Sequence, residues 1–267
     1  MHLAILHDGR PALLRVEGPA GAPVALFLHP FPLHADAWDE VLKACGRSGL
    51  CAAALDAPGF GGTPPLGGPL SMEAVADLAA CALDVLGARR AALVGCSMGG
   101  YAVMAFAKKH PGRLSAVALV STRANADTAA GKENREKQAQ LALSKGAHAV
   151  TADFVPKLLA PDAPQALLQH VFGLASRATA QGIADAMRGM ASRPDRTAEL
   201  AQWRWPALVI AGEKDQIISR AESAALAAGI PGARLHVVAG SGHLPMLEAP
   251  REVAPLLVSH LQLRIHD

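Results

Sequence analysis

The chain has 267 residues, which is long enough for one large α/β domain or for two small domains. Hydrophobic residues make up 51% and charged residues 18% of it, a globular balance that excludes a largely disordered chain. A formal net charge of only +2 and the scatter of the basic residues argue against a nucleic-acid partner. Since the sequence has no signal-peptide pattern and no run of 18 apolar residues, we expect a cytoplasmic protein without a membrane partner.

Short apolar runs alternate with amphipathic stretches of helical length, which is the pattern of a mostly parallel sheet flanked by helices. The chain opens with a predicted hairpin of residues 2–9 and 11–18, turned at Asp8-Gly9. Further strands are expected at residues 24–29, 51–56, 91–95, 114–121, 206–212 and 233–240. Helices are expected at residues 35–45, 71–86 and 97–110, and after each of the last two strands.

The strand signals disappear between Thr122 and Gln202, where the sequence predicts helices with short breaks. The simplest interpretation is a helical insertion over residues 122–202 that follows the sixth strand. The α/β core would then consist of residues 1–121 and 203–267.

Residues 95–99 have the G-x-S-x-G pattern, with Ser97 at the centre. The segment joins an apolar strand to a helix-forming stretch, which is the context that a nucleophile elbow requires. Gly95 and Gly99 fit such a turn because a tight, strained backbone leaves no room for a Cβ atom at either position. The turn would present Ser97 at the carboxyl edge of the sheet, where open α/β sheets bind ligands, and we predict it to be the nucleophile. Cys96 lies one position too early and is expected to pack against the sheet.

A serine nucleophile needs a base to accept its proton, and the base needs a carboxylate to orient it. His243 follows the last predicted strand and Asp215 follows the strand before it, so both loops open at the same edge as Ser97. We predict His243 as the base and Asp215 as the acid. Glu213, in the same loop as Asp215, is the main competitor. Glu248 is a weaker one, because we expect it at the start of the final helix.

These residues give the chain a resemblance to the α/β-hydrolase superfamily, and in particular to small capped serine esterases and enol-lactonases. The opening motif of those enzymes is similar to residues 29–34, HPFPLH, followed by Trp38. The resemblance implies an α/β-hydrolase fold: a mostly parallel eight-stranded sheet flanked by helices, with a helical cap insertion. The motifs that carry it occur in the expected order: FLHPFP, LDAPGFGGT, GCSMGG, GEKD and GSGH.

The same resemblance assigns an oxyanion hole to the backbone N–H groups of Phe31 and Met98. Pro30 stands where these enzymes usually have glycine, which puts the flexibility of the loop in doubt but leaves the Phe31 N–H available. Asp56 and His29 are expected to organise their loops rather than to react.

The insertion of residues 122–202 corresponds to the cap of the superfamily, which would cover Ser97 and supply most of the substrate pocket. Its larger apolar side chains could line that pocket or form the interior of the cap, so we assign none of them to the substrate: Phe154, Leu158, Phe172 and Met187.

The leading hypothesis is therefore hydrolysis of a small carboxylic ester or lactone through an acyl-enzyme, with no metal and no organic cofactor. A cofactor-free perhydrolase of the haloperoxidase type, a thioesterase and a C–C hydrolase could use the same triad. Haloalkane dehalogenases and epoxide hydrolases carry aspartate at the nucleophile position, so Ser97 argues against both. The alternative of another class is a ligand-binding protein that keeps the fold without turnover.

Overall fold

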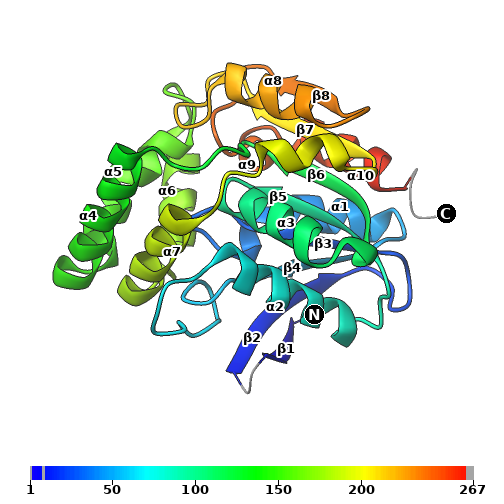
Figure 1. The fold of residues 1–267 in the computed structure, drawn as a ribbon, viewed down its shortest axis with the longest axis horizontal. Coiled ribbons are helices and arrows are strands. Elements are labelled where there is room, and N and C mark those ends of the chain that lie inside the picture. The colour runs from blue at the N-terminus through cyan, green and yellow to red at the C-terminus, as the bar shows by residue number, and fades with distance from the viewer. Residues whose placement is uncertain (1, 8–9, 263–267) are drawn as a thin grey trace.

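An eight-stranded sheet forms the centre of the molecule, in the order β1-β2-β4-β3-β5-β6-β7-β8 (Figure 1). The computed structural model describes residues 2–7 and 10–262, so the predicted turn at Asp8-Gly9 lies outside the described residues. Strand β2 is antiparallel to both of its neighbours, and all the other pairs from β4 to β8 are parallel. The strands are β1 (His2–His7), β2 (Arg10–Glu17), β3 (Val24–Leu28), β4 (Cys51–Leu55), β5 (Ala91–Cys96), β6 (Leu114–Val120), β7 (Ala207–Gly212) and β8 (Arg234–Val238).

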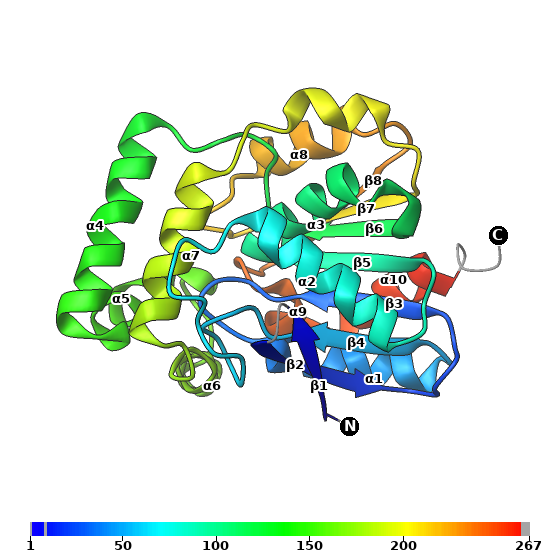
Figure 2. The ribbon, with the colours of Figure 1, turned by 60° about the horizontal axis from the view of Figure 1, so that its bottom comes forward.

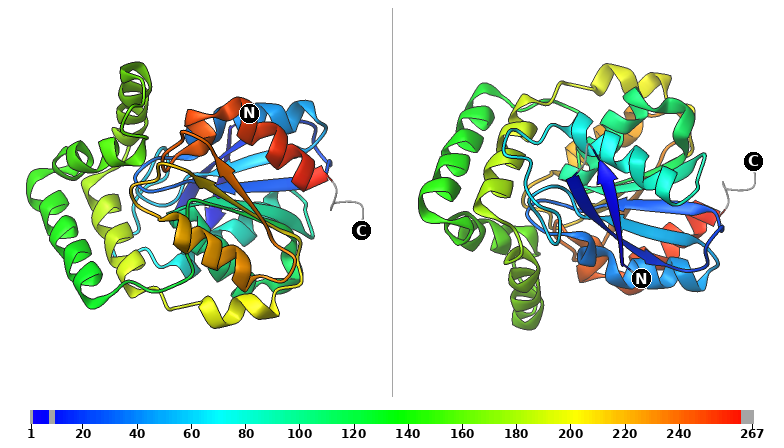
Figure 3. Two further views of the ribbon diagram at one scale, coloured as in Figure 1. Left: turned by 90° about the horizontal axis from the view of Figure 1, so that it is seen from above. Right: turned by 90° about the horizontal axis from the view of Figure 1, so that it is seen from below.

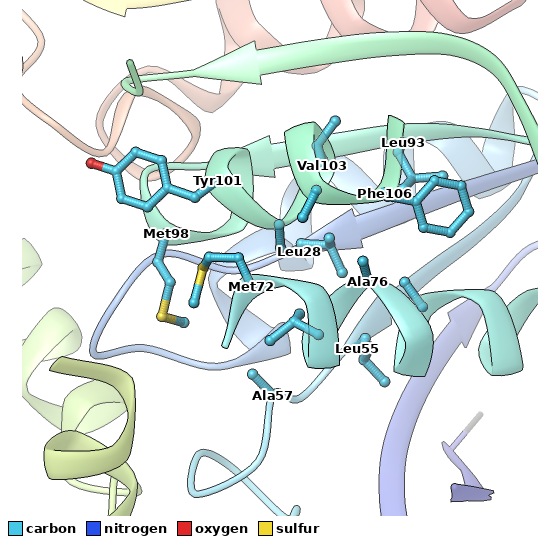
Figure 4. Packing of buried hydrophobic residues seen from close by; sticks show 14 of the residues in the cluster. Leu28, Leu55, Ala57, Met72, Ala76, Leu93, Met98, Tyr101, Val103 and Phe106 are labelled. Atoms are coloured by element: carbon cyan, nitrogen blue, oxygen red, sulfur yellow. The ribbon is translucent and has the colours of Figure 1, made fainter. Parts of the chain in front are cut away.

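Helices cover both faces of this sheet, so the inner strands are buried along their whole length and consist of continuous apolar runs. Two separate apolar clusters fill the layers on either side. Figure 4 shows the layer beneath α2 and α3, where Met98 lies beside Met72 and Leu28. On this side lie α2 (Met72–Val85), α3 (Met98–Lys109) and α8 (Arg220–Gly229), and on the other α1 (Asp39–Arg47) and α10 (Pro250–Gln262).

The helix expected at residues 35–45 begins differently from the prediction. Its first turn is a 3-10 helix, η1 (Ala35–Trp38), and the α-helix α1 starts at Asp39. The ring of His34 accepts a hydrogen bond from the Asp36 N–H, which caps the tighter first turn.

Helices fill the segment between β6 and β7, and they gather at one end of the molecule (Figures 1 and 2). Figure 3 shows the same group beside the sheet from two opposite directions. The last piece, η4 (Thr197–Gln202), instead packs on α8 of the core through the buried Leu200. The others are α4 (Ala129–Lys145), α5 (Ala147–Phe154), η3 (Val155–Leu158), α6 (Gln165–Ala175) and α7 (Ala180–Ser192).

Three contacts seat these helices on loops that leave the carboxyl ends of the strands. The Thr179 N–H donates to the Gly59 carbonyl after β4 (3.0 Å). The rings of Phe154 and Phe31, the latter in the loop after β3, meet edge to face with centroids 5.4 Å apart. After β8, the His243 N–H donates to the carbonyl of Leu158 (3.1 Å). The inserted helices therefore lie against the edge of the sheet at which Ser97, Asp215 and His243 are found.

Searched over residues 2–7 and 10–262, the structure contains no helix that is both long and apolar enough to cross a membrane.

Candidate active site

Ser97 joins β5 to α3 in a backbone conformation that few residues other than glycine adopt, with φ 51° and ψ −111°. Its N–H donates to the carbonyl of Val120 (2.9 Å), which ties the turn to the neighbouring strand β6. Its carbonyl accepts hydrogen bonds from the Thr122 hydroxyl (2.9 Å) and the Tyr101 N–H (3.2 Å). The strained turn is thus held by backbone contacts on both sides, which leaves the Ser97 hydroxyl free of a backbone role.

The two glycines that flank this turn are required by close backbone approaches. A Cβ atom on Gly95 would lie 2.3 Å from the carbonyl oxygen of Gly99. A Cβ atom on Gly99 would lie 2.1 Å from the carbonyl oxygen of Leu28, at the end of β3. Both distances are far below van der Waals contact, so a larger residue at either position would push the elbow open.

Asp215 and His243 form a buried pair between the loops that follow β7 and β8. The Nδ1 atom of His243 lies 2.8 Å from Oδ2 and 3.0 Å from Oδ1 of Asp215. Oδ1 also accepts from the N–H groups of Ile217 (2.8 Å) and Ile218 (3.0 Å). Burial alone would raise the pKa of the Asp215 carboxyl. The hydrogen bond and charge of His243, together with the two N–H donors, lower the pKa by more than burial raises it, so it lies below its usual range.

An ionised Asp215 can only accept hydrogen bonds, so His243 must carry its proton on Nδ1. In the neutral form of such a ring Nε2 is the acceptor, and here this atom is buried and has no hydrogen-bond partner among the described residues. The thiol of Cys96, the residue before Ser97, lies 3.8 Å from the His243 carbonyl. The unpartnered ring nitrogen therefore belongs to a loop that contacts the elbow, which is where a base for Ser97 is needed.

Neither Glu213, the main competitor of Asp215, nor Cys96, the neighbour of Ser97, is placed to take part in the reaction. Glu213 accepts a hydrogen bond from the Gly240 N–H (2.9 Å) at the surface, whereas His243 bonds to Asp215. Burial, aided by the charge of Asp215, raises the pKa of the Cys96 thiol well above its usual value, which keeps it protonated.

The loop that carries Phe31 is held by the two polar residues that the sequence suggests as organisers. Burial lowers the pKa of His29 to about 4, so the ring is neutral. The Nδ1–H of His29 donates to the Pro30 carbonyl, and Nε2 accepts from the Ala57 N–H (3.0 Å each). Asp56 accepts from the N–H groups of Ala35 and Gly62 (2.8 Å each). These bonds cross-link the loops after β3 and β4 at the edge of the sheet.

The N–H groups of Phe31 and Met98 have no hydrogen-bond acceptor in the part of the chain that the structure describes. Met98 is the first residue of α3, where a helix leaves its N–H without an internal partner. Phe31 is buried, and its ring also contacts Phe60 and Phe154. Both N–H groups are therefore available to a developing negative charge, as an oxyanion hole requires.

Comparison with known proteins identifies the family of the chain. Residues 23–250 match the family described as alpha/beta hydrolase fold. The chain belongs to this family. The α/β-hydrolase fold expected from the sequence motifs is thereby confirmed.

Three known proteins match nearly the whole length of this α/β-hydrolase. The pimeloyl-[acyl-carrier protein] methyl ester esterase of Chromobacterium violaceum is 28% identical over 93% of this chain and 98% of its own. A thermophilic esterase from Thermogutta terrifontis is 30% identical, with all of both chains covered and a TM-score of 0.92. The enol-lactonase of Burkholderia xenovorans LB400 shares the fold, with 23% identity, a TM-score of 0.88 and coverage of 98% and 100% of the two chains.

Glu248 has a role in this α/β-hydrolase that sequence reasoning missed. It lies in the short helix α9 (Pro245–Glu248), ahead of the final helix where it was expected. Its Oε2 accepts from the N–H groups of Gly242 (2.9 Å) and Ala160 (2.8 Å), and its Oε1 accepts from Leu244 (3.2 Å). One carboxylate thus holds the residues on both sides of His243 and fastens the inserted segment to the same loop. All three donors are backbone groups, so no residue pattern in the sequence points to them.

Replacing Glu248 by glutamine should lower the free energy of unfolding by about 1–3 kcal/mol and turnover by about tenfold or more. The amide offers one accepting oxygen in place of two and has no charge, so at least one buried N–H loses its partner. Thermal unfolding and kcat on a small ester measure the two effects. Glu252→Gln is the matched control, since that residue pairs with His236 at the surface. Equal behaviour of the two variants would contradict the assigned role.

Proposed function

We propose that this α/β-hydrolase is a serine hydrolase that cleaves a small carboxylic ester or lactone through an acyl-enzyme. The observation that carries the proposal is the buried Asp215–His243 pair, with an unpartnered Nε2, on a loop that contacts the Ser97 elbow. The esterases among the relatives support the same class of reaction.

In this mechanism His243 Nε2 takes the proton of the Ser97 hydroxyl as the oxygen attacks the carbonyl carbon of the ester. The resulting oxyanion accepts hydrogen bonds from the Phe31 and Met98 N–H groups, a contribution of about 3 kcal/mol per donor. His243 then gives its proton to the leaving alkoxide, and the acyl group stays on Ser97. A water molecule, deprotonated by His243, attacks the acyl carbon and releases the acid and the free serine. Asp215 keeps the ring in the tautomer that accepts at Nε2.

The experiment that tests this proposal is a substrate panel combined with labelling of the nucleophile. Hydrolysis of p-nitrophenyl esters or lactones, with covalent labelling of Ser97 by a fluorophosphonate, is the expected result. Faster turnover of thioesters, or of bromide with peroxide, would move the activity to a thioesterase or a perhydrolase. An unlabelled Ser97 and no turnover of any substrate would favour a ligand-binding protein of the same fold.

We also propose that the inserted residues 122–202 act as a lid over a core of residues 1–121 and 203–267. Helices α4–α7 carry this role, whereas η4 lies on the core. Support comes from Phe154, which touches Phe31 beside the expected oxyanion hole and lines a cavity among the lid helices. Leu158 is fully buried in the apolar core, and Phe172 lines a different groove between α5 and α6.

Phe154→Ala should therefore reorder the preference among acyl chain lengths by about tenfold, with a smaller change in kcat on an acetate ester. A lid side chain that binds ground state and transition state equally affects KM more than kcat. Phe172→Ala is the matched control, with no reordering expected, and thermal unfolding of both variants excludes loss of the fold. Two stable variants with the same substrate ranking as the parent would argue against the lid.

A further inference from the structure

A cavity of about 370 Å³ lies between helices α4, α5 and α7 and the segment that follows β6; we call it the arginine cavity. Two contacts join its wall to the proposed active site. Arg123 lines it, and the preceding residue, Thr122, donates a hydrogen bond to the Ser97 carbonyl. Phe154 also lines it and packs against Phe31. The wall of the arginine cavity is therefore linked to the proposed active site through Thr122 and Phe31.

Basic groups outnumber acidic ones on the wall of this cavity. Arg123, Arg135 and Lys157 face only two carboxylates, Asp127 and Asp153. Two neighbours also pair with these groups: Arg193 with Asp127, and Glu222 with Arg123. They add one positive and one negative charge, so the cavity still has a net charge of one positive unit.

The buried carboxylate of Asp127 is already fully engaged. Its Oδ1 lies 2.9 Å from both Arg123 and Arg193, and its Oδ2 is paired with Arg135. Burial raises the pKa of this carboxyl, but the hydrogen bonds and charges of Arg193 and Arg135 outweigh burial and lower the pKa well below its usual range. Asp127 therefore stays ionised and has no capacity left to neutralise the remaining positive charge.

Several N–H donors around the cavity have no oxygen acceptor. Among the residues that the structure describes, the Nη1 of Arg135 reaches only the thioether sulfurs of Met187 (3.6 Å) and Met190 (3.5 Å), which are weak acceptors. The Nε of Arg123 is buried and unpartnered, and Lys157 makes no ion pair within the described residues. A buried donor such as the Arg123 Nε–H is costly unless a ligand satisfies it, and Arg135 and the exposed Lys157 add further free donors beside it.

We propose that the arginine cavity binds a carboxylate carried by the substrate at a distance from its reacting ester. The inference rests on the proposed function and names a substrate class for it: monoesters of dicarboxylic acids, or lactones that bear a carboxylate. A guanidinium presents paired N–H groups that match the two oxygens of a carboxylate. An excess of one positive charge suits a carboxylate better than a dianionic phosphate.

The kinetic test compares monomethyl esters of the linear dicarboxylic acids from succinate to suberate with the same esters whose free carboxylate is replaced by a primary amide. The amide has nearly the same shape and no charge. At the best chain length we expect kcat/KM to be about ten- to a hundredfold higher for the acid, since a charged hydrogen bond is lost with the amide. Equal kcat/KM for acid and amide at every chain length would overturn the proposal.

Two variants assign the effect to the cavity. Arg135→Met should reduce the ratio of kcat/KM for the acid to that for the amide to about threefold or less. The buried Asp127 stays paired in this variant, because Arg123 and Arg193 remain. Lys157→Gln, at an exposed residue without an ion pair, should reduce the ratio without any risk to the fold. Lys132→Gln on α4, which does not line the cavity, is the matched control and should leave the ratio unchanged. A ratio that survives both cavity variants would overturn the assignment.

Direct binding separates this inference from the proposed function. Calorimetry with Ser97→Ala protein measures binding of the same dicarboxylates, of their diamides and of inorganic phosphate, and needs no turnover. Binding of a dicarboxylate that Arg135→Met weakens at least tenfold would support the cavity even if no ester were hydrolysed. Ester hydrolysis without dicarboxylate binding, or tighter binding of phosphate, would overturn the cavity assignment and leave the proposed function standing.

Discussion

Ser97→Ala should abolish ester hydrolysis, with a fall in kcat of about 10⁶-fold, while the protein stays folded. The hydroxyl is the atom that attacks in the proposed mechanism, and its backbone contacts do not involve the side chain. The remaining activity would come from the Phe31 and Met98 N–H groups and from substrate binding. Turnover of a p-nitrophenyl ester and thermal unfolding measure the two properties.

Cys96→Ala is the control for this experiment. The thiol is fully buried and stays protonated, so its removal should leave most of the activity in place. Ser97→Gly gives a second check on folding, because glycine adopts φ 51° without strain and should keep the stability of the parent. An active Ser97→Ala variant beside a folded but inactive Cys96→Ala variant would show that the nucleophile is misassigned.

Asp215→Asn should lower kcat by about 10⁴-fold with little change in KM. The asparagine oxygen can still accept from the Ile217 and Ile218 N–H groups, so the loop after β7 keeps its shape. Its amide would donate toward His243 Nδ1 and favour the tautomer with the proton on Nε2, which can no longer accept from Ser97. Steady-state kinetics on a small ester, with unfolding as a check, would measure the effect.

Glu213→Gln is the matched control, since it changes the same kind of side chain two residues earlier in the same loop. The Glu213 side chain accepts a hydrogen bond from the Gly240 N–H at the surface, so its amide variant should keep activity within a few-fold of the parent. A larger loss in Glu213→Gln than in Asp215→Asn would reassign the acid.

The amino-acid sequence by itself determines the parts of this protein that depend on local spacing. Continuous apolar runs such as β5 require a strand covered on both faces, and Gly95 and Gly99 require the tight elbow around Ser97. The order of the parallel strands then brings the loops of Asp215 and His243 to the same edge. Hydrophobic periodicity and the residue preferences of turns depend on neighbours in the chain, so both can be predicted before the fold is known.

Only the tertiary structure decides which of these groups meet. The choice between Asp215 and Glu213 depends on how the loops after β7 and β8 pack together, and both residues lie in the same short stretch of sequence. Glu248 holds His243 through backbone N–H groups, which have no signature in the sequence. The positive charge in the arginine cavity arises where α4 docks beside the segment after β6, bringing Arg135 to Asp127. Such contacts join residues that are distant in the chain, and their geometry is set by packing between elements rather than by any local pattern.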